Sequence, residues 1–168
     1  LEFRRVLFRS LLTRKGYNLI YENKSITISS FPLKHRIATS GFLFKETEKL
    51  RHIKREMIDY YDIPIREINN IKNGADFITA KGEVVPNDRL TSPPSPQRSY
   101  AYCSDTAYDE SIVPHIKGVD LLYHEATFSE SEIERTAKTG HSTAKQAAEI
   151  AKLAEVKKLV IGHFSSRY

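Results

Sequence analysis

Apolar strands that alternate with helices in the C-terminal half are the feature that most constrains the fold. The expected strands are Ser99–Cys103, Val119–Tyr123 and Lys158–Ile161. The expected helices are Glu110–Lys117, Glu130–Lys138 and Thr143–Glu155, the last opened by a capping box of Thr143 and Gln146. Because this alternation places crossover helices over a sheet, the sequence predicts an α/β fold.

The N-terminal half predicts antiparallel strands followed by helices. The expected strands are Tyr17–Tyr21, Ser25–Ser30 and Ile37–Phe44, of which the first two form a hairpin. Gly41 interrupts the third strand and indicates a bulge or a close approach of another residue. A helix is expected over Glu46–Tyr61 and a shorter one after Pro64, and we interpret residues 46–72 as a helical substrate arm.

Composition limits the kind of site and the compartment. Cys103 is the single cysteine, which excludes an internal disulfide and a cysteine zinc cluster and suits a reducing compartment such as the cytoplasm. No apolar run in the sequence approaches the roughly 18–20 residues that a membrane span needs. The formal charge of +5 is compatible with a polyanionic partner, but an ordinary solvated surface is the more common reason for such a charge.

Residues 1–10, with the sequence LEFRRVLFRS, look like a non-native leader left by cloning or sequence assembly. They carry three arginines among apolar residues and lack the cleavage site of a signal peptide. Without them the formal charge falls from +5 to +3. We therefore expect residues 11–168 to be native, and the natural protein to continue towards its N-terminus.

Polar side chains follow the expected strands at the points where the strands end. His35, Asp105 and His163 each come just after an apolar run, and His124 and Glu125 follow another. In open α/β sheets ligands bind beyond the carboxyl ends of the strands, and imidazole and carboxylate groups suit zinc. A hydrogen-bonded structural histidine, and an aspartate that caps a helix, explain the same residues without a metal.

The segment Gly140–Ala144, GHSTA, raises a serine-hydrolase alternative. It resembles part of the nucleophile elbow G-x-S-x-G. A helix is expected before it in place of a buried strand, however, and Ala144 replaces the second glycine. The sequence therefore argues against a serine hydrolase, and Cys103 is interpreted as a small buried residue.

Five stretches together resemble the ribonuclease Z family of tRNA 3′-processing endoribonucleases. They are Phe31–His35 (FPLKH) with the following SGFLF, Tyr102–Thr106 (YCSDT), His124–Phe128 (HEATF), His141–Ala144 (HSTA) and Gly162–Tyr168 (GHFSSRY). Each motif is weak alone, but their order and separations match from about residue 18 to the last residue. The resemblance implies the C-terminal part of an αββα metallo-β-lactamase sandwich, whose complete form holds two zinc ions.

The resemblance also assigns roles. The metal ligands would be His35, Asp105 and His163, the catalytic pair His141 and Glu125, and the substrate-phosphate contacts Ser165 and Arg167. Asp105 would bridge both ions, and His141, oriented by Glu125, would protonate the leaving 3′ oxygen. Arg167 could equally be solvated or paired with a carboxylate. The implied reaction is the attack of a metal-bridged hydroxide on a tRNA precursor, which releases the 3′ trailer.

Two departures limit the resemblance. The family's main metal signature, His-x-His-x-Asp-His, does not occur in the sequence, so three ligands remain for two ions. We therefore expect the isolated chain to be inactive and to bind zinc weakly. The arm also lacks the Gly-Pro element that many relatives use to hold tRNA. Basic residues could contact phosphates instead, or form an ordinary charged helix face: Lys45, Lys49, Arg51, Lys54, Arg55 and Arg66.

Two other functions fit the same residues. One is a phosphodiesterase or other metallo-hydrolase of small substrates, which would need no helical arm. The other is a non-catalytic RNA-binding remnant that never had the missing ligands. The leading interpretation remains a zinc-dependent endoribonuclease, with precursor tRNA as partner, a homodimeric assembly and no contact with a membrane.

Overall fold

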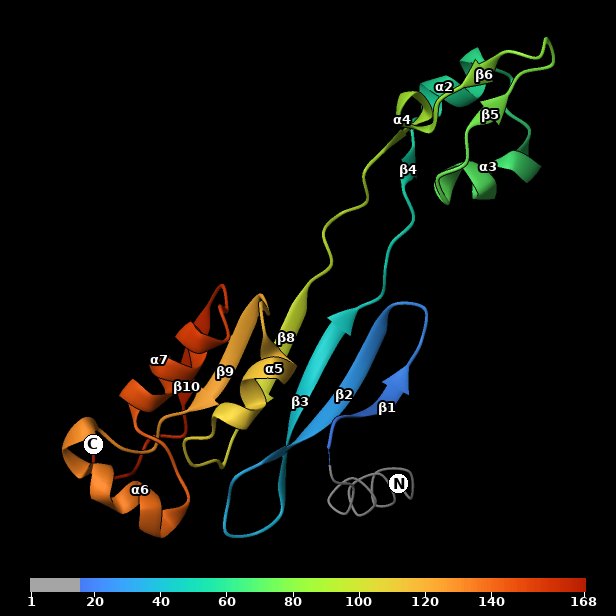
Figure 1. Ribbon diagram of the computed structural model, residues 1–168. Coiled ribbons are helices and arrows are strands. Elements are labelled where there is room, and N and C mark those ends of the chain that lie inside the picture. The colour runs from blue at the N-terminus through green and yellow to red at the C-terminus, as the bar shows by residue number, and fades with distance from the viewer. Residues whose placement is uncertain (1–15) are drawn as a thin grey trace. The chain divides into compact units, whose positions relative to one another are not determined.

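A computed structural model describes residues 16–168, which divide into two compact units (Figure 1). The first unit comprises the residues up to Thr47 and from Arg98 onward, and the second comprises Glu48–Gln97. The expected leader, residues 1–10, lies outside the described residues. Within residues 16–168, no helix has the length and apolar character needed to cross a membrane.

The first unit is built on a six-stranded sheet. In spatial order its strands are β1 (Asn18–Glu22), β2 (Ile26–Leu33), β3 (Thr39–Glu46), β8 (Ser99–Cys103), β9 (Leu121–Glu125) and β10 (Leu159–Gly162). Neighbours from β1 to β8 are antiparallel, whereas β8, β9 and β10 run parallel. The three parallel strands therefore end at the same edge of the sheet, as the strand–helix alternation predicted (Figure 1).

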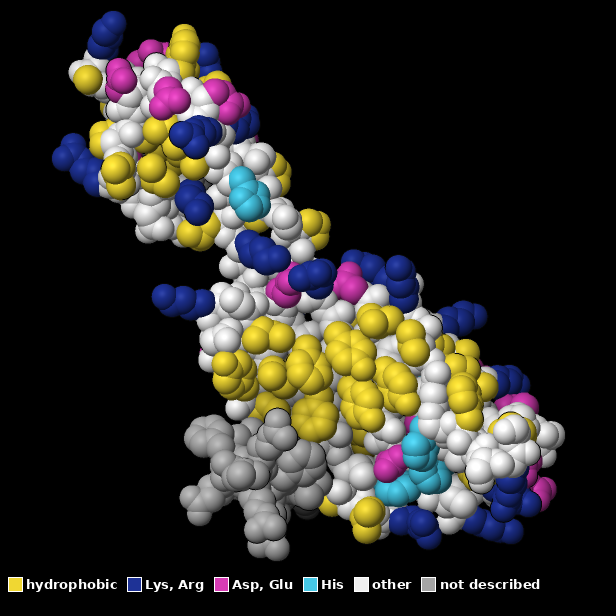
Figure 2. Space-filling view, turned by 180° about the vertical axis from the view of Figure 1, so that it is seen from behind, with side chains coloured by type: hydrophobic (Ala, Val, Ile, Leu, Met, Phe, Trp, Pro, Cys, Tyr) yellow, Lys and Arg dark blue, Asp and Glu magenta, His cyan; other side chains and the backbone are white. Residues whose placement is uncertain are grey.

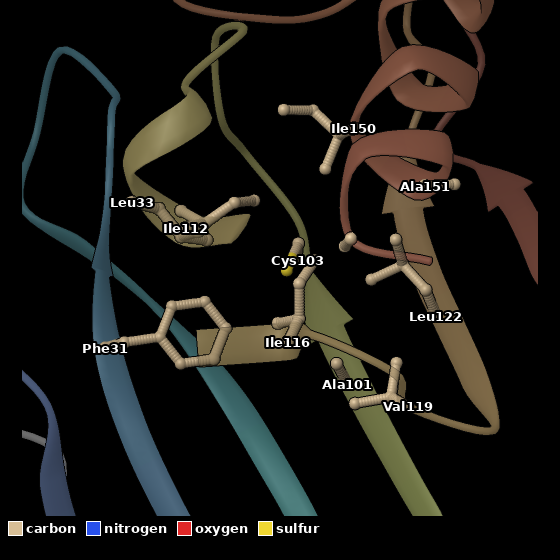
Figure 3. Packing of buried hydrophobic residues seen from close by; sticks show 11 residues of the cluster. Phe31, Leu33, Ala101, Cys103, Ile112, Ile116, Val119, Leu122, Ile150 and Ala151 are labelled. Carbon is tan, nitrogen blue, oxygen red and sulfur yellow. The ribbon is translucent and has the colours of Figure 1, made fainter. Parts of the chain in front are cut away.

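Helices cover one face of this sheet. The helices of the first unit are η1 (Glu110–Ile112), α5 (Val113–Ile116), η2 (Glu130–Glu132), α6 (Ile133–Thr139) and α7 (Ala144–Leu153). The expected capping box opens α7, because Thr143 and Gln146 each accept from the other's backbone N–H. Buried side chains of the strands, among them Phe31, Cys103 and Leu122, pack against Ile116 of α5 and Ile150 of α7 (Figure 3).

Gly41 leaves room for the ring of Phe31 in this core. A Cβ built on Gly41 would lie 2.5 Å from Cε2 of Phe31, which no side chain could tolerate without displacing the ring. The pairing of β2 with β3 continues past Gly41 without a register shift. Of the two expected explanations for this glycine, the close approach is therefore the correct one.

The opposite face of the sheet carries aromatic side chains. Phe44 stacks on Tyr100 and Tyr102 stacks on Tyr123, with ring centroids 5.7 and 4.9 Å apart. Figure 2 shows hydrophobic side chains gathered on this side of the first unit, away from the helices. Contiguous apolar surface of this kind usually marks an interaction surface. The described part of the first unit thus holds one sheet, covered by helices on one face.

The second unit has its own small core. Its elements are β4 (His52–Ile53), α2 (Arg55–Tyr60), α3 (Ile65–Lys72), β5 (Phe77–Ile78), β6 (Val84–Val85), α4 (Asn87–Leu90) and β7 (Thr91–Ser92). Its buried hydrophobic residues are Ile63, Ile71, Phe77, Val85 and Leu90. The strand pairs β4–β7 and β5–β6 are antiparallel.

The helix expected over Glu46–Tyr61 is wrong for most of its length. Strand β3 continues to Glu46, β4 occupies His52–Ile53, and α2 begins only at Arg55. The apolar spacing from Leu50 to Ile58 imitated a helical face, but Leu50 is 41% exposed and Ile53 reaches the core from a strand. Local periodicity could not reveal that residues 52–53 pair with a strand almost forty residues later.

Candidate metal and catalytic site

The structure brings four of the expected site residues together at the carboxyl ends of the parallel strands. Nε2 of His163, which follows β10, lies 3.3 Å from Oδ1 of Asp105, which follows β8. Ligand atoms of Asp105, Glu125, His141 and His163 all lie within 4.8 Å of one another. Figure 2 shows histidine and acidic side chains together at the border of the apolar face.

His35 lies beside this group. Its ring centroid is 4.9 Å from that of His141. Its Nδ1 is 2.8 Å from the carbonyl oxygen of Gly140. Because a carbonyl can only accept, Nδ1 of His35 donates, and Nε2 is the nitrogen left for another partner.

Glu125 is fully buried and accepts five hydrogen bonds. Its Oε1 accepts from Nδ1 of His141 at 2.7 Å and from the N–H of Thr106 at 2.8 Å. Its Oε2 accepts from the hydroxyl and the N–H of Thr127 at 2.6 and 3.2 Å, and from the N–H of Ser142 at 3.1 Å. Since both oxygens are engaged, we interpret Glu125 as a group that orients its neighbours and does not bind a cation.

His124 belongs to the core. The strand expected at Val119–Tyr123 is β9, which reaches Glu125, so that His124 lies within the strand and not after it. His124 is fully buried, donates from Nδ1 to the carbonyl of Glu125 at 2.7 Å, and has its pKa lowered by burial. Its Nε2 has no hydrogen-bond partner among the described residues.

Asp105 and His163 share an uncommon backbone conformation. Their φ angles are 61° and 62°, in the left-handed region that side-chain-bearing residues rarely adopt. Such conformations cost on the order of 1–3 kcal/mol each and cluster at functional sites. The two residues that approach each other most closely in the site are therefore both held in strained backbone.

Three imidazoles at this edge share one hydrogen-bond pattern. Nδ1 of His35, His141 and His163 contacts a carbonyl, a carboxylate and a hydroxyl oxygen, at 2.8, 2.7 and 2.9 Å. Histidines that bind metals usually hold their second ring nitrogen in this way, which fixes the orientation of the ring. If the proton of His163 is on Nδ1, Nε2 of His163 and Oδ1 of Asp105 present lone pairs to each other at 3.3 Å, and a cation between them would remove their repulsion. The donor set therefore fits a cation such as zinc.

The two expected phosphate contacts lie in the C-terminal segment. Ser165 donates its N–H to the carbonyl of Thr127 at 3.1 Å. Nη1 of Arg167 lies 3.7 Å from Oε1 of Glu132. Arg167 is thus paired with a carboxylate, which was one of the alternatives left open for it.

Neither Ser142 nor Cys103 is placed to act as a nucleophile. Ser142 follows helix α6, is fully buried, and donates its hydroxyl to the carbonyl of Thr106 at 2.7 Å. Cys103 is fully buried, and burial raises its pKa to about 12. The burial of Ser142 agrees with the argument against a serine hydrolase, and the interpretation of Cys103 as a small buried residue is confirmed.

Sequence reasoning overlooked two residues of the site. Thr127 connects Glu125 with His163 through its hydroxyl. Gly140 ends α6 in a left-handed conformation and offers its carbonyl to His35. Thr127 lies inside the HEATF motif and Gly140 directly precedes HSTA, so the motifs contained a signal, but no pattern showed which contacts these residues make.

Alanine at Gly140 is expected to disturb the site specifically. The φ angle of 79° penalises any side chain, and a Cβ would lie 2.8 Å from Nδ1 of His35. Gly118→Ala is the matched control, because φ there is 69° and no atom lies within 4 Å of the added Cβ. Urea unfolding should show that Gly140→Ala lowers the free energy of unfolding by about 1–3 kcal/mol more than Gly118→Ala. Equal losses would show that the contact with His35 is unimportant.

Sequence comparisons match this chain to one group of proteins. A family model described as a beta-lactamase superfamily domain matches residues 89–164. A protein of Bacteroides thetaiotaomicron named ribonuclease Z is 55% identical over 164 residues, which are 98% of this chain and 52% of that protein. A ribonuclease Z of Parabacteroides distasonis is 55% identical over 159 residues, covering 95% and 52% respectively. The chain therefore spans about half the length of the curated relatives it matches.

Solved structures show the same fold. The crystal structure of the short form of human tRNase Z superposes with a TM-score of 0.57 at 24% identity, over 90% of this chain and 40% of that one. The long-form RNase Z of yeast gives 0.55 at 18% identity, over 100% and 16%. A metallo-beta-lactamase fold protein of Bacillus subtilis gives 0.51 at 16% identity, over 89% and 40%. The architecture is that of the metallo-β-lactamase fold.

Proposed function

Because the chain belongs to the ribonuclease Z family, of whose curated members it spans about half, we propose that the whole protein is a metal-dependent endoribonuclease that removes the 3′ trailer from tRNA precursors. One observation carries the proposal. His141, held by the buried carboxylate of Glu125, stands within 4.8 Å of the Asp105–His163 pair. A proton donor beside a cation site is what hydrolysis of a phosphodiester requires.

We assign metal binding, proton donation and ring orientation to different residues of this chain. Asp105, His163 and His35 would hold the metal, which when bound would act as a Lewis acid that acidifies water and neutralises phosphate charge. His141 keeps Nδ1 on Glu125 and can hold a proton on Nε2 for the leaving 3′ oxygen. Glu125 fixes the orientation of the His141 ring by its hydrogen bond to Nδ1.

The second unit supports a nucleic-acid substrate. It contains a pocket of about 800 Å³ whose lining includes three aromatic residues, three basic residues and four acidic residues: Tyr60, Tyr61, Phe77, Arg66, Lys81, Arg89, Asp62, Glu67, Asp76 and Glu83. The guanidinium of Arg89 lies 5.5 Å from the centroid of the Tyr61 ring. Aromatic side chains suit stacking with bases, whereas the three cations stand beside four carboxylates and give the pocket no excess of positive charge for phosphates. We favour tRNA over a small ester because a small phosphodiester needs no separate unit such as Glu48–Gln97.

We also propose that the metal is zinc, that the whole protein is a homodimer and that it lies in the cytoplasm. Imidazole and carboxylate donors suit zinc, and a single buried cysteine suits a reducing compartment. The homodimer rests on the family resemblance, and size-exclusion chromatography with light scattering tests it.

The isolated chain is expected to be inactive, since three ligands are too few for two ions. A chimera tests the proposal, in which this chain replaces the matching half of the Bacteroides thetaiotaomicron ribonuclease Z. With zinc, the chimera should cleave a 3′-extended precursor tRNA far faster than bis-p-nitrophenyl phosphate. Activity on the small ester alone would favour the phosphodiesterase alternative, and RNA binding without cleavage would favour the non-catalytic remnant.

A further inference from the structure

Thr127 lies between Glu125 and His163 in the site. It is 8% exposed and follows the end of β9 by two residues. Its Oγ1 lies 2.6 Å from Oε2 of Glu125 and 2.9 Å from Nδ1 of His163. One hydroxyl therefore contacts both the carboxylate that orients His141 and the imidazole that faces Asp105.

The direction of these two hydrogen bonds follows from proton counting. A hydroxyl has one proton, and Thr127 donates it to Glu125, whose Oε2 receives two further N–H groups and is an acceptor throughout. The hydroxyl oxygen can then only accept from His163, so Nδ1 of His163 carries a proton. In the neutral ring this leaves the lone pair on Nε2, the nitrogen 3.3 Å from Asp105.

The backbone of Thr127 holds the hydroxyl in this position. Its N–H donates to Glu125 at 3.2 Å, and its carbonyl accepts from the N–H of Ser165 at 3.1 Å. Thr127 is thus fixed to the strand end before it and to the segment that follows His163. A residue anchored on both sides can control the orientation of the ring between them.

We infer that Thr127 is a positioning residue, which sets His163 in the tautomer with its proton on Nδ1 and so presents Nε2 to a cation beside Asp105. The inference rests on the proposed function, because it gives the site a cation to receive. It concerns a property of the metal-free chain, however, and can be measured without any cleavage reaction.

Two substitutions at Thr127 test the inference. Thr127→Val keeps the shape and removes the hydroxyl, whereas Thr127→Ser keeps the hydroxyl. Histidine labelled with ¹⁵N reports the tautomer, because protonated and unprotonated ring nitrogens resonate far apart, and His163→Asn identifies the signals of His163. Titration with zinc chloride then measures the affinity of each variant.

At a pH where the ring is neutral, the unsubstituted chain and Thr127→Ser should both show His163 protonated on Nδ1 and unprotonated on Nε2. Thr127→Val should lose this preference and bind zinc about 10–100-fold more weakly, the usual effect of removing such a hydrogen-bond partner. An unchanged tautomer in Thr127→Val, or a serine variant as impaired as valine, would overturn the inference. If the chimera cleaved no tRNA while the tautomer still changed, the proposed function would fail and the inference would stand.

Discussion

Replacement of His141 by alanine is expected to lower the rate of precursor-tRNA cleavage by about 10²–10⁴-fold in the chimera with the Bacteroides thetaiotaomicron protein. The leaving 3′ oxygen would then depart without a positioned proton donor. The protein fold should persist, because the His141 side chain is 16% exposed and its loss leaves Glu125 with four other hydrogen bonds. Single-turnover kinetics with saturating enzyme separates the chemical step from substrate binding.

A control and a second readout make the result specific. His52→Ala removes an exposed histidine of the second unit and should leave the single-turnover rate unchanged. Zinc bound by the His141→Ala variant should equal that of the unsubstituted chimera, since His141 is proposed as a proton donor and not as a ligand. A parallel loss of zinc and of activity would assign His141 to the metal, and an undiminished rate would remove it from the reaction.

Much of the sheet could be predicted from local patterns. The strand Ser99–Cys103 was expected with the bounds that the structure shows, and the capping box fixed the start of α7. Because parallel strands end at one edge, Asp105 and His163 could be expected to meet. These predictions succeeded since each depends on a few neighbouring residues and on a topological rule.

The contacts that organise the site could not be predicted in the same way. The hydrogen bonds of Glu125 come from Thr106, Thr127, Ser142 and His141, which belong to three separate loops. The left-handed backbone of Asp105 and His163 could not be predicted either, since it is a minority conformation even for Asp and His, which adopt it more often than most residues. Motif likeness indicated that these segments matter, but only three-dimensional structure shows that one buried carboxylate joins them.

Glu125→Ala is expected to destabilise the first unit by about 3–5 kcal/mol. The substitution removes the acceptor for the N–H groups of Thr106, Thr127 and Ser142, all of them buried residues. Each donor left without a partner costs about 1–3 kcal/mol, and relaxation or entry of water recovers part of the sum. The loss should therefore greatly exceed that of an ordinary surface substitution.

Urea unfolding of the isolated chain measures this loss, with Glu149→Ala as the matched control. Glu149 is an exposed glutamate in α7, and its replacement should change the free energy of unfolding by no more than about 0.5 kcal/mol. Glu125→Gln should fall between the two, because an amide keeps one acceptor for Thr106 or Ser142 but directs its NH₂ group at donors. If Glu125→Ala were as stable as the control, the carboxylate would not hold these loops together. The orientation of His141 would then need another cause, since the same hydrogen-bond network is what places its ring beside Asp105 and His163.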